Sequence, residues 1–402
     1  MTLRHAFAAL SLIAVLALAG CGGPTAATPA KATAAAKPSA AATTAAQTQA
    51  ADGSAEPQPS TGQANSGDMV EWTGPIMHIF THQLIAWPEK AANGKQAVSL
   101  DTNMLDVTEF KRLLQQLYDN DYALIDINKT YEVVGSGKDA KVVQAKLMVP
   151  KGKKPLIYSI DDVRYDYRVQ GTGSVDKLIV GKDGKIATFT YGKNSDTGQD
   201  ETRYDNDVYP ILEDFIAKHP DFSVNGAKAT LGMTGYVSLF GYRTDRLQGA
   251  MRAGEIAKAK VVAQWFKDHG WNFATHGYAH LHSAHVTTEK LRSDAQKWRN
   301  EVENVVGPAH TYIWPFGETV PYGSASRNML INEFDWRMFC PVDTHSPTIW
   351  DGKSVTNGRA PMDGLSLRHF RKTYMKELGI DTATIFDAAY RQRLNPKGGP
   401  VK

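Results

Sequence analysis

Beyond Met69, the apolar residues of this chain alternate between short runs rich in β-branched and aromatic residues and longer amphipathic runs. Such alternation is typical of an α/β domain, in which helices separate the strands of a mostly parallel sheet. Seven segments are predicted as strands: 76–81, 123–127, 156–160, 227–233, 272–276, 311–314 and 337–341. Their order favours a parallel barrel, and catalytic groups on such a barrel lie at the carboxyl ends of its strands.

The clearest predicted helix begins after Asp106, a candidate N-cap, and Glu109 three residues later completes a capping box. Apolar residues then follow at helical spacing: Phe110, Leu113, Leu114 and Leu117. A second helix is predicted over 253–269, with Gly270 as its stop signal.

An insertion is predicted at 164–204, directly after the third strand, where it could reshape a cleft. Within it, the Asp-Gly turn of residues 182–185 joins two apolar runs. This pattern predicts a β-hairpin over 176–191, set into the α/β frame.

The N-terminal part of the chain predicts export rather than fold. Residues 1–20 combine a short basic start with an apolar run and small residues, as a signal peptide does. Residues 18–23 (Leu-Ala-Gly-Cys-Gly-Gly) resemble the bacterial lipobox, in which the cysteine, here Cys21, is acylated and becomes the new N-terminus. An ordinary secreted protein or an uncleaved anchor is the alternative.

Residues 21–69 are predicted as a disordered stalk rich in Ala, Thr and Pro, because they carry almost no large apolar side chain to bury. A leader without a spacing role is equally compatible with this composition. Residues 70–402 are then expected to form a single domain. The net charge of +3 gives no electrostatic argument for nucleic-acid binding, and two cysteines exclude a disulfide scaffold or a cysteine metal cluster.

Two adjacent carboxylates, Asp161 and Asp162, follow the third predicted strand. Burying them is costly unless a cation or hydrogen-bond donors satisfy them. Because neighbouring side chains diverge, one carboxylate can hold a metal while the other faces the reacting water. A helix N-cap or a surface turn is the structural alternative.

Histidines gather after the fifth predicted strand, where His276 and His280 stand four positions apart. Two imidazoles at this spacing can converge on one ion if the strand turns into a helical loop, although either one can also be structural. His282 and His285 are expected to flank the site or to face the substrate. One Asp with two His leaves coordination positions open for water and substrate, which indicates a metal-dependent hydrolase.

The sixth predicted strand ends in Trp314, Pro315 and Phe316. An aromatic, proline and glycine corner of this kind is typical of a rigid wall with an exposed backbone amide, suited to a ring-shaped ligand. A plain turn from strand to loop is the alternative.

Taken together, these runs resemble the motifs of polysaccharide deacetylases of the chitooligosaccharide deacetylase (NodB) homology type. Residues 159–163 (Ser-Ile-Asp-Asp-Val) are similar to the family's Thr-Phe-Asp-Asp-Gly, and 276–280 (His-Gly-Tyr-Ala-His) to His-[Ser/Thr]-x-x-His. Residues 313–317 (Ile-Trp-Pro-Phe-Gly) are similar to Arg-x-Pro-Tyr-Gly, and 367–369 (Leu-Arg-His) to Leu-x-His. The resemblance covers roughly 70–370 and implies a distorted (β/α) barrel, here with an inserted β-hairpin.

The resemblance implies roles for the matched residues. Asp162, His276 and His280 would bind a divalent metal, usually zinc in this family, and Asp161 would be the general base. His369 would protonate the departing sugar amine, because an amide nitrogen is a poor leaving group.

The implied substrate is a cell-surface or cell-wall polysaccharide containing N-acetylglucosamine, from which N-acetyl groups would be removed. Trp314, Pro315, Phe316 and Arg359 are the expected substrate contacts, and a backbone N–H near Phe316 would hold the oxyanion. The protein is expected outside the cytoplasm, attached to the membrane through a lipid on Cys21.

Three positions depart from the family pattern. Val163 replaces a Gly, Gly277 replaces Ser or Thr, and Ile313 replaces an Arg that orients the catalytic Asp. Since Ile cannot supply a charge-assisted hydrogen bond, either Arg164 or Arg359 substitutes, or the base is poorly tuned and activity is weak.

Two other functions compete with the deacetylase hypothesis. One is a non-catalytic carbohydrate-binding or wall-organising lipoprotein that keeps the barrel and the metal site, which Ile313 supports best. The other keeps the metal site but hydrolyses a different acyl or amide bond.

Overall fold

All seven predicted strands are present in one sheet of the computed structural model, which describes residues 67–343, 348–399 and 401. The predicted signal peptide, Cys21 and nearly all of the predicted stalk lie outside these residues. The strands of this sheet are β2 (Met77–Thr81), β3 (Tyr122–Leu124), β7 (Lys154–Ile160), β11 (Thr230–Met233), β12 (Asn272–Thr275), β13 (Thr311–Ile313), β14 (Met338–Cys340), β15 (Ile349–Trp350), β16 (Val355–Thr356) and β17 (Ala360–Pro361).

The sheet runs in the order β15-β16-β14-β13-β12-β11-β7-β2-β17, with β3 beside β7. Every pairing is parallel except that of β15 with β16. The segment 355–361 closes the curved sheet into a barrel, because β16 pairs with β14 while β17 pairs with β2. A parallel bridge between Val342 and Arg359 joins these two pairings. The result is the distorted (β/α) barrel that the sequence predicts.

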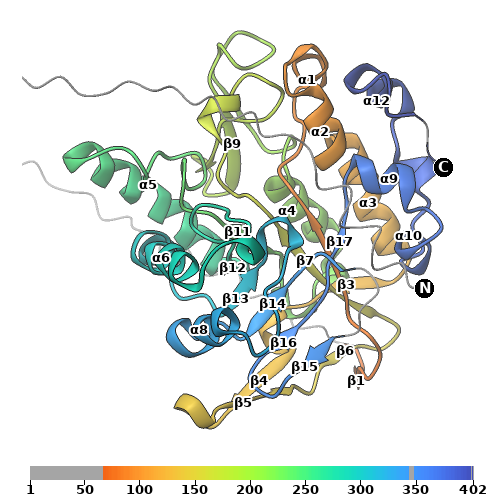
Figure 1. Ribbon diagram of the computed structural model, residues 1–402. Helices are drawn as coiled ribbons and strands as arrows, with labels where there is room; N and C mark the ends of the chain where they lie inside the picture. The colour runs from red at the N-terminus through yellow and green to blue at the C-terminus, as the bar shows by residue number, and fades with distance from the viewer. Residues whose placement is uncertain (1–66, 344–347, 400, 402) are drawn as a thin grey trace, which may run out of the picture. The chain divides into compact units, whose positions relative to one another are not determined.

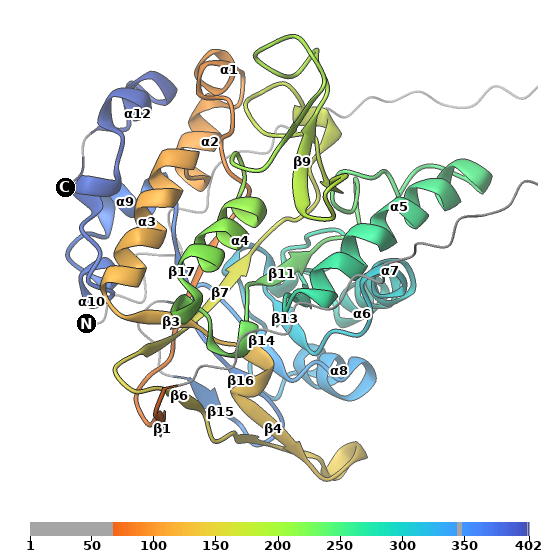
Figure 2. The same ribbon diagram turned by 180° about the vertical axis from the view of Figure 1, so that it is seen from behind.

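Helices follow the strands and cover the outside of the sheet, as Figures 1 and 2 show for α3, α4, α5, α6 and α8. The capping box of Asp106 and Glu109 is confirmed at the start of α3, and Gly270 follows the end of α5 with a positive φ of 83°. The helices are α1 (Pro88–Asn93), α2 (Ala97–Asn103), α3 (Val107–Asp119), α4 (Val208–Lys218), α5 (Gly249–Asp268), α6 (Thr288–Trp298), α7 (Asn304–Val306), α8 (Ala325–Phe334), α9 (Gly364–His369), α10 (Tyr374–Glu377), α11 (Thr382–Ile385) and α12 (Ala388–Leu394).

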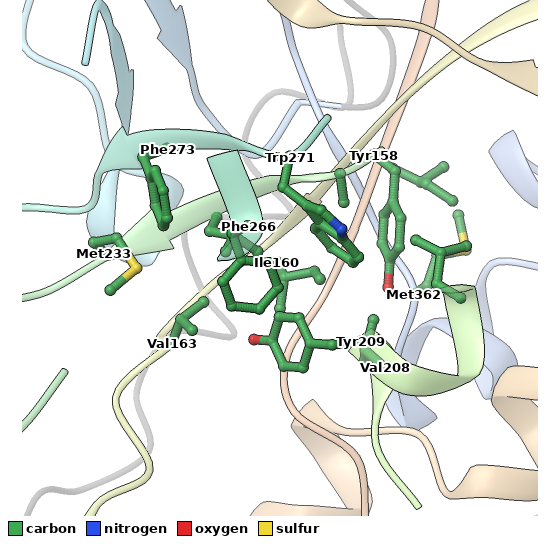
Figure 3. Close-up of a cluster of buried hydrophobic side chains, with 14 of the residues drawn as sticks. Tyr158, Ile160, Val163, Val208, Tyr209, Met233, Phe266, Trp271, Phe273 and Met362 are labelled. Carbon is green, nitrogen blue, oxygen red and sulfur yellow. The ribbon is translucent and has the colours of Figure 1, made fainter. Parts of the chain in front are cut away.

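Alternate residues of each strand face two separate cores, as the pleat of a strand requires. Tyr158 and Ile160 of β7 face outward and pack under the helices, in the large cluster that Figure 3 shows. Ile157 faces inward, where a smaller cluster fills the floor of the barrel with Ala274, Ile313 and other residues. Beyond this floor, inward-facing polar residues, including His78 and Ser159, build the site described below.

Three small sheets extend the barrel, formed by β1 (Met69–Glu71) with β6 (Met148–Pro150), β4 (Tyr131–Val134) with β5 (Lys141–Gln144), and β8 (Lys177–Val180), β9 (Ile186–Thr190) and β10 (Glu201–Arg203) in the order β10-β9-β8. The pairing of β8 with β9 confirms the predicted hairpin. Figures 1 and 2 show this insertion and the β4–β5 hairpin at opposite ends of the sheet. The insertion lies at the end where the strands finish.

The described residues belong to one compact unit of the chain. None of the helices within it combines the length and the apolar character needed to cross a membrane.

Candidate metal centre

Three side chains that could hold a metal ion converge at the carboxyl ends of β7 and β12. Asp162, His276 and His280 each offer a ligand atom, and these atoms all lie within 4.8 Å of one another. His280 Nε2 is 3.8 Å from Asp162 Oδ1, and the rings of His276 and His280 are 4.8 Å apart between centroids. Two imidazoles and one carboxylate are a donor set that suits a catalytic zinc or a similar divalent ion.

The imidazole of His276 is fixed in one tautomer. Its Nδ1 donates to the backbone carbonyl of Ile313 at 2.9 Å, because a carbonyl oxygen can only accept. The second ring nitrogen, Nε2, therefore carries the free lone pair and faces the two aspartates, 3.8 Å from Asp161 Oδ2. A backbone carbonyl that orients the ring in this way is the outer support that metal-binding histidines usually have.

The turn between the two histidines requires glycine at position 277. Gly277 has a φ of +66°, and a Cβ there would lie 3.2 Å from a carboxylate oxygen of Asp294. Asp294 accepts the backbone N–H groups of Tyr278 and Ala279 at 2.7 and 2.9 Å, which holds the turn in place. The departure from the family's Ser or Thr therefore has a local steric cause.

Asp162, His280 and Phe316 share an unusual backbone conformation. Their φ angles are +58°, +52° and +58°, in the left-handed region that residues with a Cβ rarely adopt. Non-glycine residues held in this region cluster at functional sites, where the surrounding structure compensates for the strain. Three of them around one group of ligands support a functional interpretation of this end of the barrel.

Asp161 is held by a buried cation that comes from the opposite part of the sequence. Arg359 donates from Nη1 to Asp161 Oδ1 at 2.8 Å and from Nη2 to Oδ2 at 3.0 Å, and its side chain is fully buried. The Arg359 guanidinium also lies over the Phe80 ring, 4.2 Å from its centroid. Arg359, near the end of the run that closes the barrel, thus supplies the charge-assisted hydrogen bonds that Ile313 cannot give to Asp161.

A second layer beneath Asp161 was not anticipated from the sequence. Arg359 Nη1 also donates to Ser159 Oγ at 3.1 Å, and that hydroxyl lies 3.0 Å from His78 Nε2. His78 Nδ1 in turn lies 2.8 Å from Asn357 Oδ1. The signal in the sequence was a single polar residue in the interior of each of two mostly apolar strands, His78 in β2 and Ser159 in β7.

The protonation states suit a metal centre. Burial raises the pKa of Asp161, but the charge and hydrogen bonds of Arg359 outweigh it and hold the pKa below its usual value. Burial likewise acts on Asp162, where the Arg164 guanidinium does most to lower the pKa. Burial lowers the pKa of His276 and brings that of His280 to about 4. At neutral pH the site thus presents charged carboxylates and neutral imidazoles, the forms that bind metal.

Arg164 is the first residue of the insertion and pairs with the other aspartate. Its Nη1 donates to Asp162 Oδ1 at 2.8 Å and also contacts the Tyr236 hydroxyl. A carboxylate has about four lone-pair positions, so Asp162 can accept Arg164 and ligate a metal together. The first residue of the insertion therefore contacts the candidate ligand set.

The outer rim carries an exposed aromatic ring. Phe316 is 45% exposed and lies in a single 3₁₀ turn, Pro315–Gly317. Its ring stacks on that of His282 at 3.7 Å and meets the His280 ring edge to face at 4.4 Å. His282 Nδ1 lies 3.0 Å from a Glu318 carboxylate oxygen, and His285 is the more exposed of the two flanking histidines.

Several expected substrate contacts need correction. Trp314 and Arg359 are fully buried and Pro315 is buried, so none of the three side chains is available to a polysaccharide. Trp314 packs against Tyr312 and Phe339 on the outer side of β13 instead. Of the four expected contacts, only Phe316 has an exposed side chain.

His369, the expected acid, is the exposed last residue of α9. That helix packs against α2 and α11. Its role in protonating a leaving group remains a prediction.

No protein-family model matches the chain, and no curated protein is similar to it in sequence. A Streptococcus pyogenes deacetylase, PplD, solved in complex with acetate, is similar in structure with 12% identity and a TM-score of 0.39, over 73% of this chain and 93% of that one. A Mycobacterium smegmatis protein provisionally assigned as a polysaccharide deacetylase is similar with 14% identity and a TM-score of 0.27, over 48% of this chain and 60% of that one. Both likenesses are distant.

Proposed function

We propose that this protein is a metal-dependent deacetylase that removes N-acetyl groups from a cell-surface or cell-wall polysaccharide containing N-acetylglucosamine. One observation carries the proposal: Asp161 stands next to the candidate ligand set but is held by Arg359. A carboxylate that is fixed, charged and outside the Asp-His-His set is available to take a proton.

The residues divide the work of amide hydrolysis between them. Asp162, His276 and His280 would hold a divalent ion, which when bound polarises an acyl carbonyl and makes water more acidic. Asp161 would accept the proton of the attacking water, and Arg359 would keep that carboxylate in position without blocking both of its faces. The N–H of Phe316, presented by its left-handed turn, would donate to the oxyanion.

The outer rim supports the proposed substrate class. Phe316 exposes an apolar ring beside the ligand set, and flat aromatic surfaces of this kind suit the apolar face of a sugar ring. The predicted export signal and the lipid on Cys21 would place the domain outside the cytoplasm, where such polymers occur.

The non-catalytic alternative has lost its main support. It depended on Ile313 leaving the catalytic aspartate without a cation, and Arg359 supplies one. A hydrolase of another acyl or amide bond would use the same residues, and only the choice of substrate separates it from a deacetylase.

The test is to incubate the purified full chain and added zinc with N-acetylglucosamine oligomers, peptidoglycan and exopolysaccharide. Acetate and free amine should appear in equal amounts from at least one of them. Release of free amine without acetate would favour a hydrolase of a different acyl or amide bond. No product from any substrate would contradict the proposal.

A further inference from the structure

A histidine that the sequence analysis did not single out stands at the mouth of the barrel, beside the candidate base. Thr81, the last residue of β2, pairs with Ile160, and its carbonyl accepts the N–H of Asp161 at 2.9 Å. His82 and Asp161 are therefore the residues that directly follow these two paired strand ends. The His82 ring meets the Phe80 ring edge to face, with centroids 6.0 Å apart. Since alternate residues of a strand share a face, His82 continues the inward side of His78 and Phe80.

The surroundings of His82 are those of a group that acts on the site. Burial is the largest influence on the pKa of Asp161, Asp162 and Asp363, and the charge of His82 has a smaller effect that lowers the pKa of each, so His82 lies near these carboxylates. Asp363 follows β17 and caps α9 through the N–H of Ser366 at 2.7 Å. His82 is half-buried, so it is open to solvent and to a ligand as well as to the carboxylates.

The ring of His82 is oriented for proton transfer through one nitrogen. Nδ1 donates to the backbone carbonyl of Asn103 at 2.9 Å, which fixes the proton on that atom. The exchangeable position is then Nε2. Histidine is the side chain best suited to exchange a proton near neutral pH.

Four other histidines near the site already have other partners or roles. Both ring nitrogens of His78 are engaged, by Asn357 and Ser159, and burial lowers its pKa to about 3. His276 and His280 belong to the candidate ligand set. His282 stacks on Phe316 at the outer rim.

We infer that His82 is the catalytic acid of the proposed deacetylase, in the place that the resemblance gave to His369. The inference rests on the proposed function. As water adds to the acetyl carbon, the new C–O bond forms and the water proton passes to Asp161. The C–N bond then breaks with its electron pair remaining on nitrogen, and His82, as the imidazolium protonated on both ring nitrogens, gives that nitrogen the proton of Nε2 and keeps the one on Nδ1. Acetic acid and a free amine leave, the acid then loses its proton to solvent to give acetate, and the proton on Asp161 returns to Nε2 of His82 through water.

The test compares two leaving groups on the full chain loaded with zinc. An amide nitrogen needs a proton to leave, whereas the p-nitrophenolate of p-nitrophenyl acetate does not. A general acid contributes about 10²- to 10⁴-fold, so His82→Gln should lower kcat/KM for triacetylchitotriose at least about 100-fold and for the ester less than about 10-fold. Asp161→Asn should lower both. His310→Gln, which changes an exposed histidine, is the matched control and should change neither.

A second readout does not depend on turnover. Bound zinc, measured by elemental analysis, should be the same in His82→Gln as in the wild type, because His82 is outside the ligand set. Equal loss on amide and ester, loss of zinc, or an amide-specific loss in His369→Gln but not in His82→Gln would overturn the inference. A wild-type protein inactive on both substrates would instead overturn the proposed function, and this inference with it.

Discussion

Asp161 and Asp162 are neighbours in the sequence but occupy opposite kinds of environment. The Asp161 side chain is 4% exposed and accepts hydrogen bonds from both terminal nitrogens of the buried Arg359. The Asp162 side chain is 20% exposed and receives one nitrogen of Arg164, from the insertion. Asp162 also has a positive φ of 58°, and the two carboxylates contact different guanidinium groups. One motif thus serves a fixed base position and an accessible ligand position.

Substitutions of the two aspartates should have different effects on activity and on zinc content. Asp161→Asn should reduce acetate release by about 10²- to 10⁴-fold, because it removes the proton acceptor, while zinc content stays at the wild-type value. Asp162→Asn should instead lower zinc content. Measured zinc and kcat for both variants check this prediction. Equal zinc loss in both would mean that Asp161 is a ligand and not a base.

The ion pair of Asp161 can also be broken by replacing its partner, Arg359. Arg359→Met should lower the free energy of unfolding by about 3–5 kcal/mol, since it leaves a buried carboxylate unpaired. Arg292→Met removes an exposed two-nitrogen contact to Glu333 and should cost less than about 1 kcal/mol. Denaturant unfolding of both variants measures the difference. If Arg359→Met lowers the free energy of unfolding by as little as Arg292→Met does, the buried Asp161 carboxylate does not depend on Arg359 for its stability.

The layer beneath Asp161 makes stability depend on pH. Burial holds the pKa of His78 at about 3, below its ordinary 6.5, so between these values the unfolded chain binds a proton that the folded chain does not. The free energy of unfolding should therefore fall as pH drops from 6.5 to 3, by roughly 4 kcal/mol from this group. His78→Gln should flatten that slope, and His310→Gln should not. An unchanged slope in His78→Gln would refute the assignment.

Substitution of Phe316 at the outer rim should have the smallest effect on activity. Phe316→Ala should raise KM for an oligosaccharide a few-fold with little change in kcat, because the ring contacts substrate without taking part in bond changes. Tyr322→Ala, at another exposed aromatic ring, is the control. A large fall in kcat for Phe316→Ala would mean that the turn itself is disturbed.

The sequence predicted what is local. The strands were recognised because apolar runs of strand length are bounded by turns, and the ligands because they are adjacent or four residues apart. The capping box of α3 and the hairpin of the insertion are equally local patterns.

What the sequence left open depends on distant contacts. Arg359 lies 198 residues from Asp161, so it could only be named beside Arg164 as a possible cation. Trp314 was misplaced because a residue at a strand end can face either side, and here it faces the outer core. His82 was missed because only the register of β2 against β7 brings it to Asp161.

The most direct test of a metal-dependent deacetylase measures zinc and acetate together, on the full chain and on Asp162→Ala. Near-stoichiometric zinc with acetate release from an N-acetylglucosamine polymer, both lost in the variant, is the expected result. Zinc binding without acetate release from any polymer, or acetate release that survives in zinc-free Asp162→Ala, would contradict it.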